Sequence, residues 1–401
     1  MKILWVKADF LHPTNRGGQI RTLEMLKGLH RKHEVHYAGM AEPGEIEGPE
    51  RAGEYSSRHW VVRHAAPGRR SPRFLPHLLR GLVSPVPVSV ATRRSAEMRE
   101  LLGRLTRENG YGSVVCDFLT PAINLPDLPQ SVLFQHNVEM MIWRRHAEQA
   151  ANPLAKWYFG RQARAMEQFE RQVCRAVRQV IAVSETDAGN MQHEFGLKKV
   201  EWVPTGVDTA YFAPPGKAGD PALATDLLFL GSMDWMPNID GMRWFAAEIL
   251  PLIRSRRPDT RLTICGRRPG PEIQRLASQP GITVTGTVDD VRPYLWGAKA
   301  SIVPLRIGGG TRLKIYEAMA AALPAVSTAI GAEGLTYTGG EHLHIADTPE
   351  AFAARCLELL ETPTAAKAMG QAARSLVVER FSWEGISDRF ASLLAEAPVR
   401  K

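Results

Sequence analysis

Residues 300–327 read ASIVPLRIGGGTRLKIYEAMAAALPAVS. The first five residues are an apolar run that predicts a strand, and three glycines follow at 308–310. Apolar side chains recur at helical spacing from residue 311 to residue 322, and a second short apolar run occupies 325–327. A strand, a loop, a helix and a second strand in this order are typical of a parallel sheet whose strands are connected by helices.

The same alternation continues along the chain and divides it into two similar halves. Further strands are expected at 3–6, 35–38, 60–62, 114–116, 132–134, 180–183, 227–230, 262–265 and 282–285. A proline- and glycine-rich break from Pro204 to Pro221 separates the halves, because helices and strands do not cross such a segment. We predict two α/β domains of the doubly wound, Rossmann-like class, residues 1–208 and 222–380, facing each other across a cleft. A C-terminal helix within 381–401 is expected to pack back toward the first domain. Ligands of such folds bind outside the carboxyl ends of the strands.

The composition of the 401 residues is that of a globular chain. Hydrophobic residues make up 44% and charged residues 23%, which excludes wholesale disorder and fibrous architectures. The longest run without charge, 318–332, contains Pro324 and is shorter than the roughly 20 residues that cross a bilayer. The first residues lack the apolar core of a signal peptide. Four cysteines without a Cys-x-x-Cys pair indicate reduced thiols and no zinc site. We therefore expect a cytoplasmic protein.

The net charge of +8 is unevenly distributed. No acidic residue occurs between Glu54 and Glu97, whereas this interval contains Arg58, Arg63, Arg69, Arg70, Arg73, Arg80, Arg93 and Arg94. Basic residues interleaved with leucines predict peripheral contact with an anionic membrane, at the inner membrane face of a cell; a solvated arginine-rich loop is the alternative. No nucleic-acid partner is expected, because no zinc finger or aromatic RNA-binding motif accompanies the arginines.

The glycines at 308–310 precede a helix that carries Arg312 and Lys314 near its start. A helix N-terminus has a partial positive charge, so each cation is disfavoured there by about 0.3–1 kcal/mol. A bound anion would offset this cost, and glycines let the backbone approach it closely. A diphosphate is the natural candidate, and Glu317, one turn further on, could accept hydrogen bonds from a ribose diol. The alternative is a flexible loop followed by a surface pair of Lys314 and Glu317.

These residues carry a resemblance to a known family. Residues 308–320, with Pro-Ala-Val-Ser-Thr at 324–328 and Gly-Ala-Glu-Gly-Leu at 331–335, resemble the donor-binding segment of the retaining family 4 glycosyltransferases of GT-B fold, in particular bacterial exopolysaccharide sugar transferases. The resemblance extends over nearly the whole chain. It includes Gly17-Gly18, Gln135-His136-Asn137, Pro204-Thr205-Gly206-Val207-Asp208 and Phe229-Leu230-Gly231-Ser232.

The resemblance implies transfer of a sugar from a nucleotide diphosphate donor to a hydroxyl of a glycan or lipid-linked acceptor, with retention of configuration. It implies catalytic roles for His136, Arg312, Lys314 and Glu317, with His136 where donor sugar and acceptor meet. Arg312, Lys314 and Glu317 would also contact the donor, together with Gly17, Gly18, Gly231, Ser232, Arg267, Val288, Gly308, Gly309, Gly310 and Thr311. No metal or other cofactor is expected, since the chain has no Asp-x-Asp pair to hold a divalent ion on a diphosphate.

The chain departs from the family pattern at two places. Gly309 stands where many members have a glutamate near the donor sugar. Ser232-Met233-Asp234-Trp235 stands where many members carry an Arg and a Lys after the first strand of the second domain. We therefore expect Arg312 and Lys314 to neutralise the diphosphate.

Three other functions remain as alternatives. A nucleotide-sugar epimerase can share the fold without transferring sugars. A nicotinamide-dependent oxidoreductase requires Gly-x-Gly-x-x-Gly after a strand, and Leu313 occupies the third glycine position. A donor-binding protein without catalysis gains some support from Gly309.

Overall fold

The computed structural model describes residues 1–14, 17–65, 75–82, 84–148, 150, 152–216, 220–307 and 313–396, without the side chains of Leu75 and His77. The chain forms two compact units. The first combines Met1–Pro204 with Trp383–Lys401, and the second is Thr205–Ser382. Within the described ranges, no helix is both long enough and apolar enough to cross a membrane.

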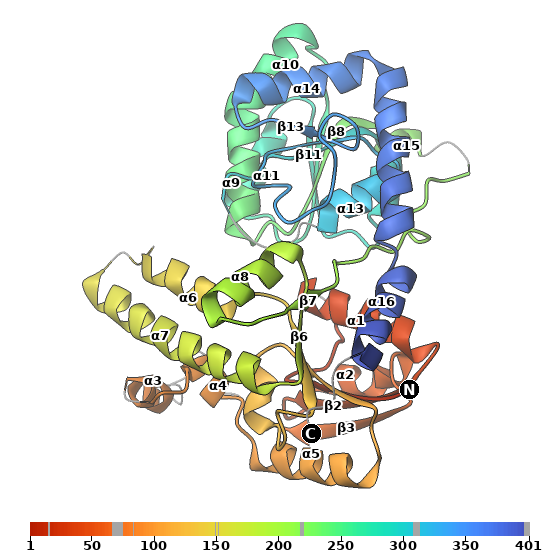
Figure 1. The fold of residues 1–401 in the computed structure, drawn as a ribbon. Helices are drawn as coiled ribbons and strands as arrows, with labels where there is room; N and C mark the ends of the chain where they lie inside the picture. Colours follow the sequence, from red (N-terminus) through yellow and green to blue (C-terminus); the bar gives the residue numbers. More distant parts are fainter. Residues whose placement is uncertain are drawn as a thin grey trace. The chain divides into compact units, whose positions relative to one another are not determined.

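The first unit contains a parallel seven-stranded sheet (Figure 1). Its strands are β1 (Lys2–Lys7), β2 (Glu34–Ala41), β3 (Arg58–Arg63), β4 (Ser113–Asp117), β5 (Ser131–Gln135), β6 (Gln179–Ala182) and β7 (Glu201–Trp202). Their order is β3-β2-β1-β4-β5-β6-β7, so the direction of winding reverses between β1 and β4. In doubly wound sheets the ligand crevice lies at this reversal, outside the carboxyl ends of the strands.

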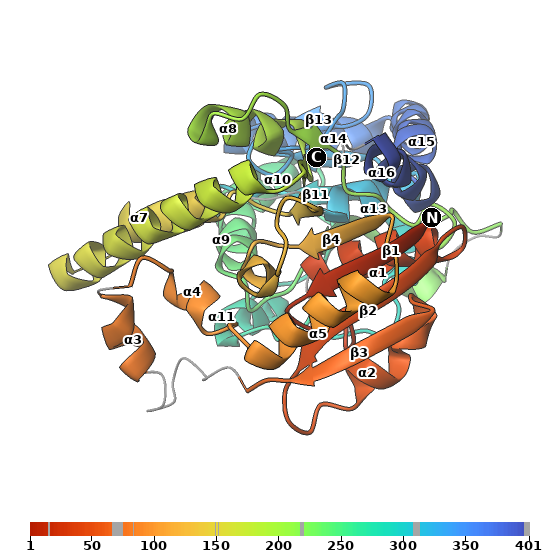
Figure 2. The same ribbon diagram turned by 60° about the horizontal axis from the view of Figure 1, so that its bottom comes forward.

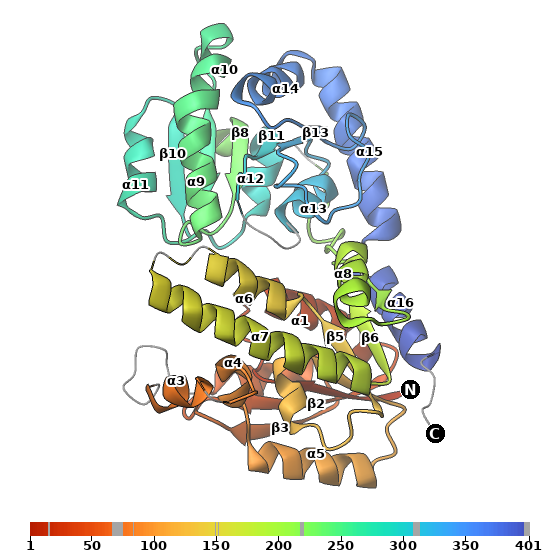
Figure 3. The same ribbon diagram turned by 60° about the vertical axis from the view of Figure 1, so that its left-hand side comes forward.

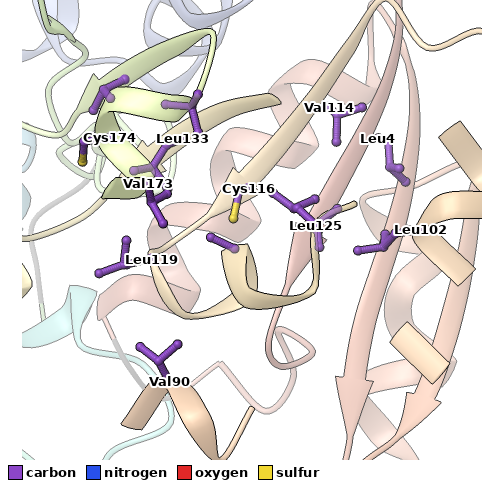
Figure 4. Packing of buried hydrophobic residues seen from close by; sticks show 14 of the residues in the cluster. Leu4, Val90, Leu102, Val114, Cys116, Leu119, Leu125, Leu133, Val173 and Cys174 are labelled. Carbon is purple, nitrogen blue, oxygen red and sulfur yellow. The ribbon is translucent and has the colours of Figure 1, made fainter. Parts of the chain in front are cut away.

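The central strands β1, β4 and β5 of this sheet are buried on both faces, since apolar residues occupy successive positions along them. Leu4 and Val6 belong to one core cluster, and Ile3 and Trp5 belong to the cluster on the other face, as the two-residue period of a strand requires. Figure 4 shows the first cluster, in which Cys116 of β4 packs among leucines and valines. The four cysteines are all buried and unpaired.

Helices cover both faces of this sheet. They are α1 (Gly17–His30), α2 (Glu47–Glu50), α3 (Leu75–Gly81), α4 (Val88–Ala91), α5 (Ala96–Glu108), α6 (Glu139–Glu148), α7 (Pro153–Ala176), α8 (Glu185–Phe195) and α16 (Trp383–Glu396). Helices α5, α7 and α8 contribute to the cluster that contains Leu4, and α1 and α16 contribute to the cluster that contains Trp5. Figure 2 shows α5 lying along the sheet.

The C-terminal helix α16 packs in the first unit against α1. A Cβ atom on Gly28 would collide with the side chain of Ser387, so glycine at this position permits the close approach of the two helices. Phe390 of α16 reaches the core and packs 5.6 Å from Trp5 between ring centroids. The chain therefore returns to its first unit after completing the second.

The second unit contains a parallel six-stranded sheet of order β10-β9-β8-β11-β12-β13 (Figure 3). Its strands are β8 (Thr225–Leu230), β9 (Leu262–Cys265), β10 (Ile282–Gly286), β11 (Ala298–Val303), β12 (Ala325–Ser327) and β13 (His344–Ile345). Its helices are α9 (Met236–Trp244), α10 (Leu250–Arg256), α11 (Pro271–Gln274), α12 (Arg292–Gly297), α13 (Leu313–Ala320), α14 (Pro349–Glu361) and α15 (Pro363–Arg380). The winding reverses between β8 and β11. Both sheets thus confirm the expected doubly wound class.

The element boundaries differ from expectation at a few places. The helix expected at about 238–256 is divided into α9, a π-helical turn at Phe245–Ile249, and α10 with Pro251 in its first turn. The edge strands β7 and β13 were not anticipated, because two residues are too few to show a periodicity. Residues 308–312, expected to form the glycine loop and helix start, lie outside the described residues.

Candidate functional site

The reversal point of the second sheet gathers several of the anticipated donor-binding residues. Gly231 and Ser232 follow β8, Arg267 follows β9, and α13 carries Lys314 and Glu317. The expected partners Gly308, Gly309, Gly310, Thr311 and Arg312 are among the residues whose placement is not described. The described site is therefore built around Lys314.

Contacts with two residues of the described ranges hold Lys314 at the carboxyl edge of the sheet. Its Nζ donates a hydrogen bond to Oδ1 of Asn238 in α9, at 3.0 Å. The same nitrogen lies 4.2 Å from the ring centroid of Phe229, whose buried ring faces the cation. Cation–π contacts of this kind stabilise an ammonium group that is partly removed from water. Asn238 is fixed in turn, because its Nδ2 donates to the carbonyl oxygen of Ser232 at 2.8 Å.

Gly231 provides the space that Lys314 occupies. A Cβ atom at this position would lie 2.6 Å from Nζ of Lys314 and 2.7 Å from Nδ2 of Asn238. Gly266 is needed for a different reason, since a Cβ atom there would collide with the backbone carbonyl of Gly231. The glycines that follow β8 and β9 thus let the two backbones approach each other beside Lys314.

Arg267 brings a second cation to the end of β8. Its Nε donates to Oγ of Ser232 at 2.7 Å, and Ser232 donates to Oδ1 of Asp234 at 2.6 Å. The hydrogen bond from Ser232, with the charges of Arg267 and Arg268, lowers the pKa of Asp234. The loop at residues 232–235 lacks the Arg and Lys that many family members carry there. Arg267, after β9, and Lys314, of α13, bring positive charge to the same place.

Glu317 lies one turn after Lys314 on α13. Burial raises the pKa of its carboxyl group to about 7, and the positive charge of Lys314 opposes this rise. Within the described ranges, no hydrogen bond reaches its carboxylate, which leaves both oxygens able to accept donors from a ligand. Val288, expected near a nucleobase, follows β10 and packs partly buried against the core cluster that contains Leu228 and Leu295. Its backbone contact with a nucleobase stays a prediction.

The reversal point of the first sheet holds a buried charge cluster. Nζ of Lys7, at the end of β1, lies 2.8 Å from Oδ2 of Asp117, at the end of β4. Oδ2 also accepts hydrogen bonds from Thr22 Oγ1 at 2.7 Å and from Trp5 Nε1 at 3.2 Å. Burial opposes ionisation of Asp117, but Lys7 and His136 outweigh it and hold its pKa well below the ordinary value. Asp117 is thus a carboxylate with several donors.

His136, which follows β5, joins this cluster through both ring nitrogens. Nε2 lies 2.7 Å from Oδ1 of Asp117, and Nδ1 lies 3.2 Å from Nη1 of Arg21. A carboxylate only accepts and a guanidinium only donates, so Nε2 carries the proton and Nδ1 is the acceptor. Burial, opposed by Asp117, lowers the pKa of His136 to about 4, and the ring stacks on Phe118 at 3.9 Å between centroids. The side chain is a neutral, oriented imidazole.

Gly17 and Gly18 begin α1 beside this cluster. A Cβ atom on Gly18 would lie 2.7 Å from Cζ of Phe118, so the glycine lets the helix start close to the ring that stacks on His136. Arg21, one turn into α1, is 9% exposed, and its Nε has no hydrogen-bond partner in the described part of the chain. Burial lowers the pKa of Arg21 to about 10, with Asp187 and Asp117 opposing.

Glu170 of α7 fixes the segment that carries His136. Its carboxylate accepts hydrogen bonds from Gln135 Nε2 at 2.7 Å and from the backbone N–H groups of Glu139 and Met140 at 3.0 and 2.9 Å. The last two groups are free donors at the start of α6, where a carboxylate is favoured. One side chain thereby connects the end of β5 to the start of the next helix.

Sequence reasoning found His136 but missed Lys7, Arg21, Asp117 and Asn238. A signal was present for two of them, since Lys7 and Asp117 are charged residues that directly follow the apolar runs at 3–6 and 114–116 and end strands β1 and β4. Nothing in the spacing of Asn238 distinguishes it from an ordinary polar residue of a helix start.

Comparisons with known proteins agree with this architecture. A family model described as Glycosyl transferases group 1 matches residues 224–362, and one described as Glycosyltransferase Family 4 matches residues 121–211. An uncharacterized 44.6 kDa protein in the cps region of Klebsiella pneumoniae is 21% identical over 406 residues, covering 98% of this chain and 99% of the relative.

Solved structures match over both units. A sucrose-phosphate synthase from Thermosynechococcus elongatus has a TM-score of 0.68 at 17% identity, with 98% of each chain covered. Anabaena HepE in complex with UDP has a TM-score of 0.69 at 13% identity, covering 98% of this chain and 100% of HepE. Two glycosyltransferase family models therefore match separate parts of the chain, family 4 at residues 121–211 and group 1 at residues 224–362, and the chain shares the GT-B fold of these solved structures.

Proposed function

We propose that the enzyme transfers a sugar from a nucleotide diphosphate donor to a hydroxyl of a glycan or lipid-linked acceptor, with retention of configuration. The second unit would bind the donor and the first the acceptor. The observation that carries the proposal is Lys314, a cation held by Asn238 and Phe229 at the reversal point of the second sheet. Ligands of doubly wound sheets bind at this point.

The proposed mechanism is stabilisation of the leaving diphosphate. The bond between the anomeric carbon and the diphosphate oxygen breaks, and the acceptor oxygen forms its bond to the same face of the sugar. The acceptor proton passes to the departing phosphate oxygen. Lys314, Arg267 and Arg312 would neutralise the growing negative charge, and Glu317 would accept hydrogen bonds from the ribose diol. With these cations in place the reaction needs no metal ion.

In the first unit, the orientation of His136 limits its role. Both ring nitrogens are bonded within the protein, so a hydrogen bond to substrate requires one of those bonds to exchange. We propose that the histidine is a neutral, fixed group that supports the acceptor site and does not exchange protons during the reaction. Gly17 and Gly18 would present backbone N–H groups to a phosphate or hydroxyl at the start of α1.

The biological setting is proposed from the relatives. The Klebsiella relative comes from a cps region, and HepE was solved with UDP. We propose a role in polysaccharide or glycoconjugate synthesis on the cytoplasmic side of the inner membrane, where the four unpaired cysteines would stay reduced. Nucleic acid is not among the proposed partners.

A nucleotide panel tests the proposal. Thermal shifts with the diphosphates of uridine, guanosine, adenosine and thymidine identify the base, and the matching nucleotide sugars are then assayed for transfer. Lys314→Ala should lower turnover roughly a hundredfold to a thousandfold, as loss of one leaving-group contact typically does. The control is Lys367→Ala, an exposed lysine of α15. Unchanged turnover in Lys314→Ala contradicts the proposed site, and an isomerised sugar without acceptor identifies an epimerase instead.

A further inference from the structure

The hairpin of α6 and α7 exposes large apolar side chains where its two helices connect. The helices lie side by side in Figures 1 and 3, and Trp143 of α6 packs 6.2 Å from Phe159 of α7 between ring centroids. At the start of α7, Leu154 is 75% exposed and Trp157 is 53% exposed. These two residues are three apart and therefore share one face of the helix. Ile142 of α6 is also exposed.

Helix α3 extends this surface. Its end is fastened to α7, because Gln162 Nε2 donates to the carbonyl of Gly81 at 3.0 Å and Arg161 Nη2 donates to the carbonyl of Ser84 at 3.1 Å. Figures 2 and 3 show α3 beside the first half of α7. Leu79 of α3 is 58% exposed. We call Leu79, Leu154 and Trp157 the hairpin tip.

The surroundings of the hairpin tip are basic. Exposed cations accompany the apolar residues on the same helices, namely Arg80, Arg145, Lys156 and Arg164. Between residues 140 and 166 the only acidic residue is Glu148, and α3 lies within the interval 55–96 that has none. Arg69, Arg70 and Arg73 of that interval are outside the described residues. Exposed apolar side chains among cations, including a partly exposed tryptophan, match the chemistry of an anionic lipid interface.

We propose that the hairpin tip docks on an anionic lipid bilayer, with Leu154, Trp157 and Leu79 entering the headgroup boundary and the neighbouring cations facing lipid phosphates. The proposal deepens the proposed function, since a lipid-linked acceptor is held in that bilayer. Neither the donor site nor the charge cluster around Asp117 contributes a residue to the tip, so docking and catalysis can be separated by substitution.

The test is co-sedimentation of the full-length enzyme with phosphatidylcholine vesicles that contain or lack anionic phosphatidylglycerol. The wild type should bind the anionic vesicles, and binding should weaken as salt shortens the Debye length from about 10 Å at 0.1 M to about 3 Å at 1 M. Leu154→Ser with Trp157→Ser should weaken binding roughly tenfold or more. Lys156→Glu should weaken it roughly fivefold or more, from about 1 kcal/mol per cation near an anionic surface. The control is Ile46→Ser, an apolar residue 61% exposed in the same unit.

Two further measurements make the result specific. Quenching of tryptophan fluorescence by brominated lipid should fall in Trp157→Phe, which places this ring in the boundary. Nucleotide binding and donor turnover without vesicles should stay at wild-type level in the tip variants. If the wild-type enzyme and every variant lack turnover, the proposed function fails, whatever the vesicle binding shows. Wild-type binding by the tip variants overturns the docking site. Two other results also overturn the docking proposal. One is equal binding of the wild type to neutral and anionic vesicles, and the other is a dimer that the tip substitutions dissociate.

Discussion

The ammonium group of Lys314 donates a hydrogen bond to Oδ1 of Asn238 beside Gly231, where the absence of a Cβ atom leaves room for both side chains. Three elements meet in this contact: the end of a strand, the start of α9 and the start of α13. A lysine near a helix N-terminus is disfavoured by the helix dipole. Here a side-chain carbonyl and an aromatic face offset that cost, and they hold the cation where the sheet reverses.

Gly231→Ala tests whether the position of this cation matters. The new Cβ would occupy the space 2.6 Å from Nζ and must displace Lys314 or Asn238. The backbone at Gly231 has no positive φ, so folding should survive, with a small loss of thermal stability. We expect turnover to fall roughly tenfold or more, a part of the hundredfold to thousandfold effect of losing the group. Gly270→Ala, which meets open space in the same unit, should leave turnover unchanged. Full activity of Gly231→Ala separates Lys314 from the reaction.

Asn238→Asp tests the charge of the site while keeping the acceptor of the hydrogen bond. The carboxylate would pair with Lys314 and cancel its charge toward a diphosphate. We expect the affinity for the nucleotide diphosphate to fall roughly tenfold, in proportion to the loss of a charge-assisted contact. Isothermal titration measures it. Asp240→Asn, which alters a partly buried carboxylate of the same helix, is the comparison and should not weaken binding.

The elements and part of the site follow from patterns within short segments. The strand at 325–327 was predicted at its observed bounds, and the apolar stripe at Ile315 and Met319 predicted a helix buried on that side. Such patterns are local, since burial repeats every two or about every four residues. The glycine loop at 308–310 remains a prediction.

Residues joined by the fold itself were beyond the sequence. Lys7 and Asp117 are 110 positions apart, and only the placement of β4 beside β1 brings them to 2.8 Å. Likewise, the sequence places Gly231 in a donor-binding turn, but it does not indicate that Lys314 and Asn238, from two different helices, lie beside that glycine. A single sequence carries no record of which distant residues touch.

Glu317 should make stability depend on pH. Burial raises the pKa of its carboxyl group from the ordinary 4.5 to about 7 in the folded enzyme. The folded state therefore binds this proton more tightly than the unfolded state does. The contribution of protonated Glu317 to the free energy of unfolding is fully present below pH 4.5 and is lost as pH rises through about 7. Burial also raises the pKa of Glu139 and Glu170 to about 7. The pH dependence of wild-type stability therefore contains the contributions of all three carboxyl groups. The difference between the melting temperatures of wild type and Glu317→Gln isolates one group. It should grow in favour of the variant from pH 5 to pH 8, whereas a constant difference contradicts the buried carboxylate.

Asp117→Asn should be the most damaging of these changes to stability. The substitution keeps the shape of the side chain but removes the charge that faces Lys7 at 2.8 Å and turns one acceptor into a donor beside Nε2 of His136. Removing one partner of a buried ion pair typically costs about 3–5 kcal/mol, because the remaining charge stays in a poorly solvating interior. Urea denaturation of the full chain should show a loss of this size in the transition of the first unit. Asp127→Asn, an exposed aspartate in the same unit, should change the midpoint little. If Lys7→Met together with Asp117→Asn recovers stability, the damage arises from the uncompensated lysine; if it does not, the orientation of His136 is the part of the cluster that the fold requires.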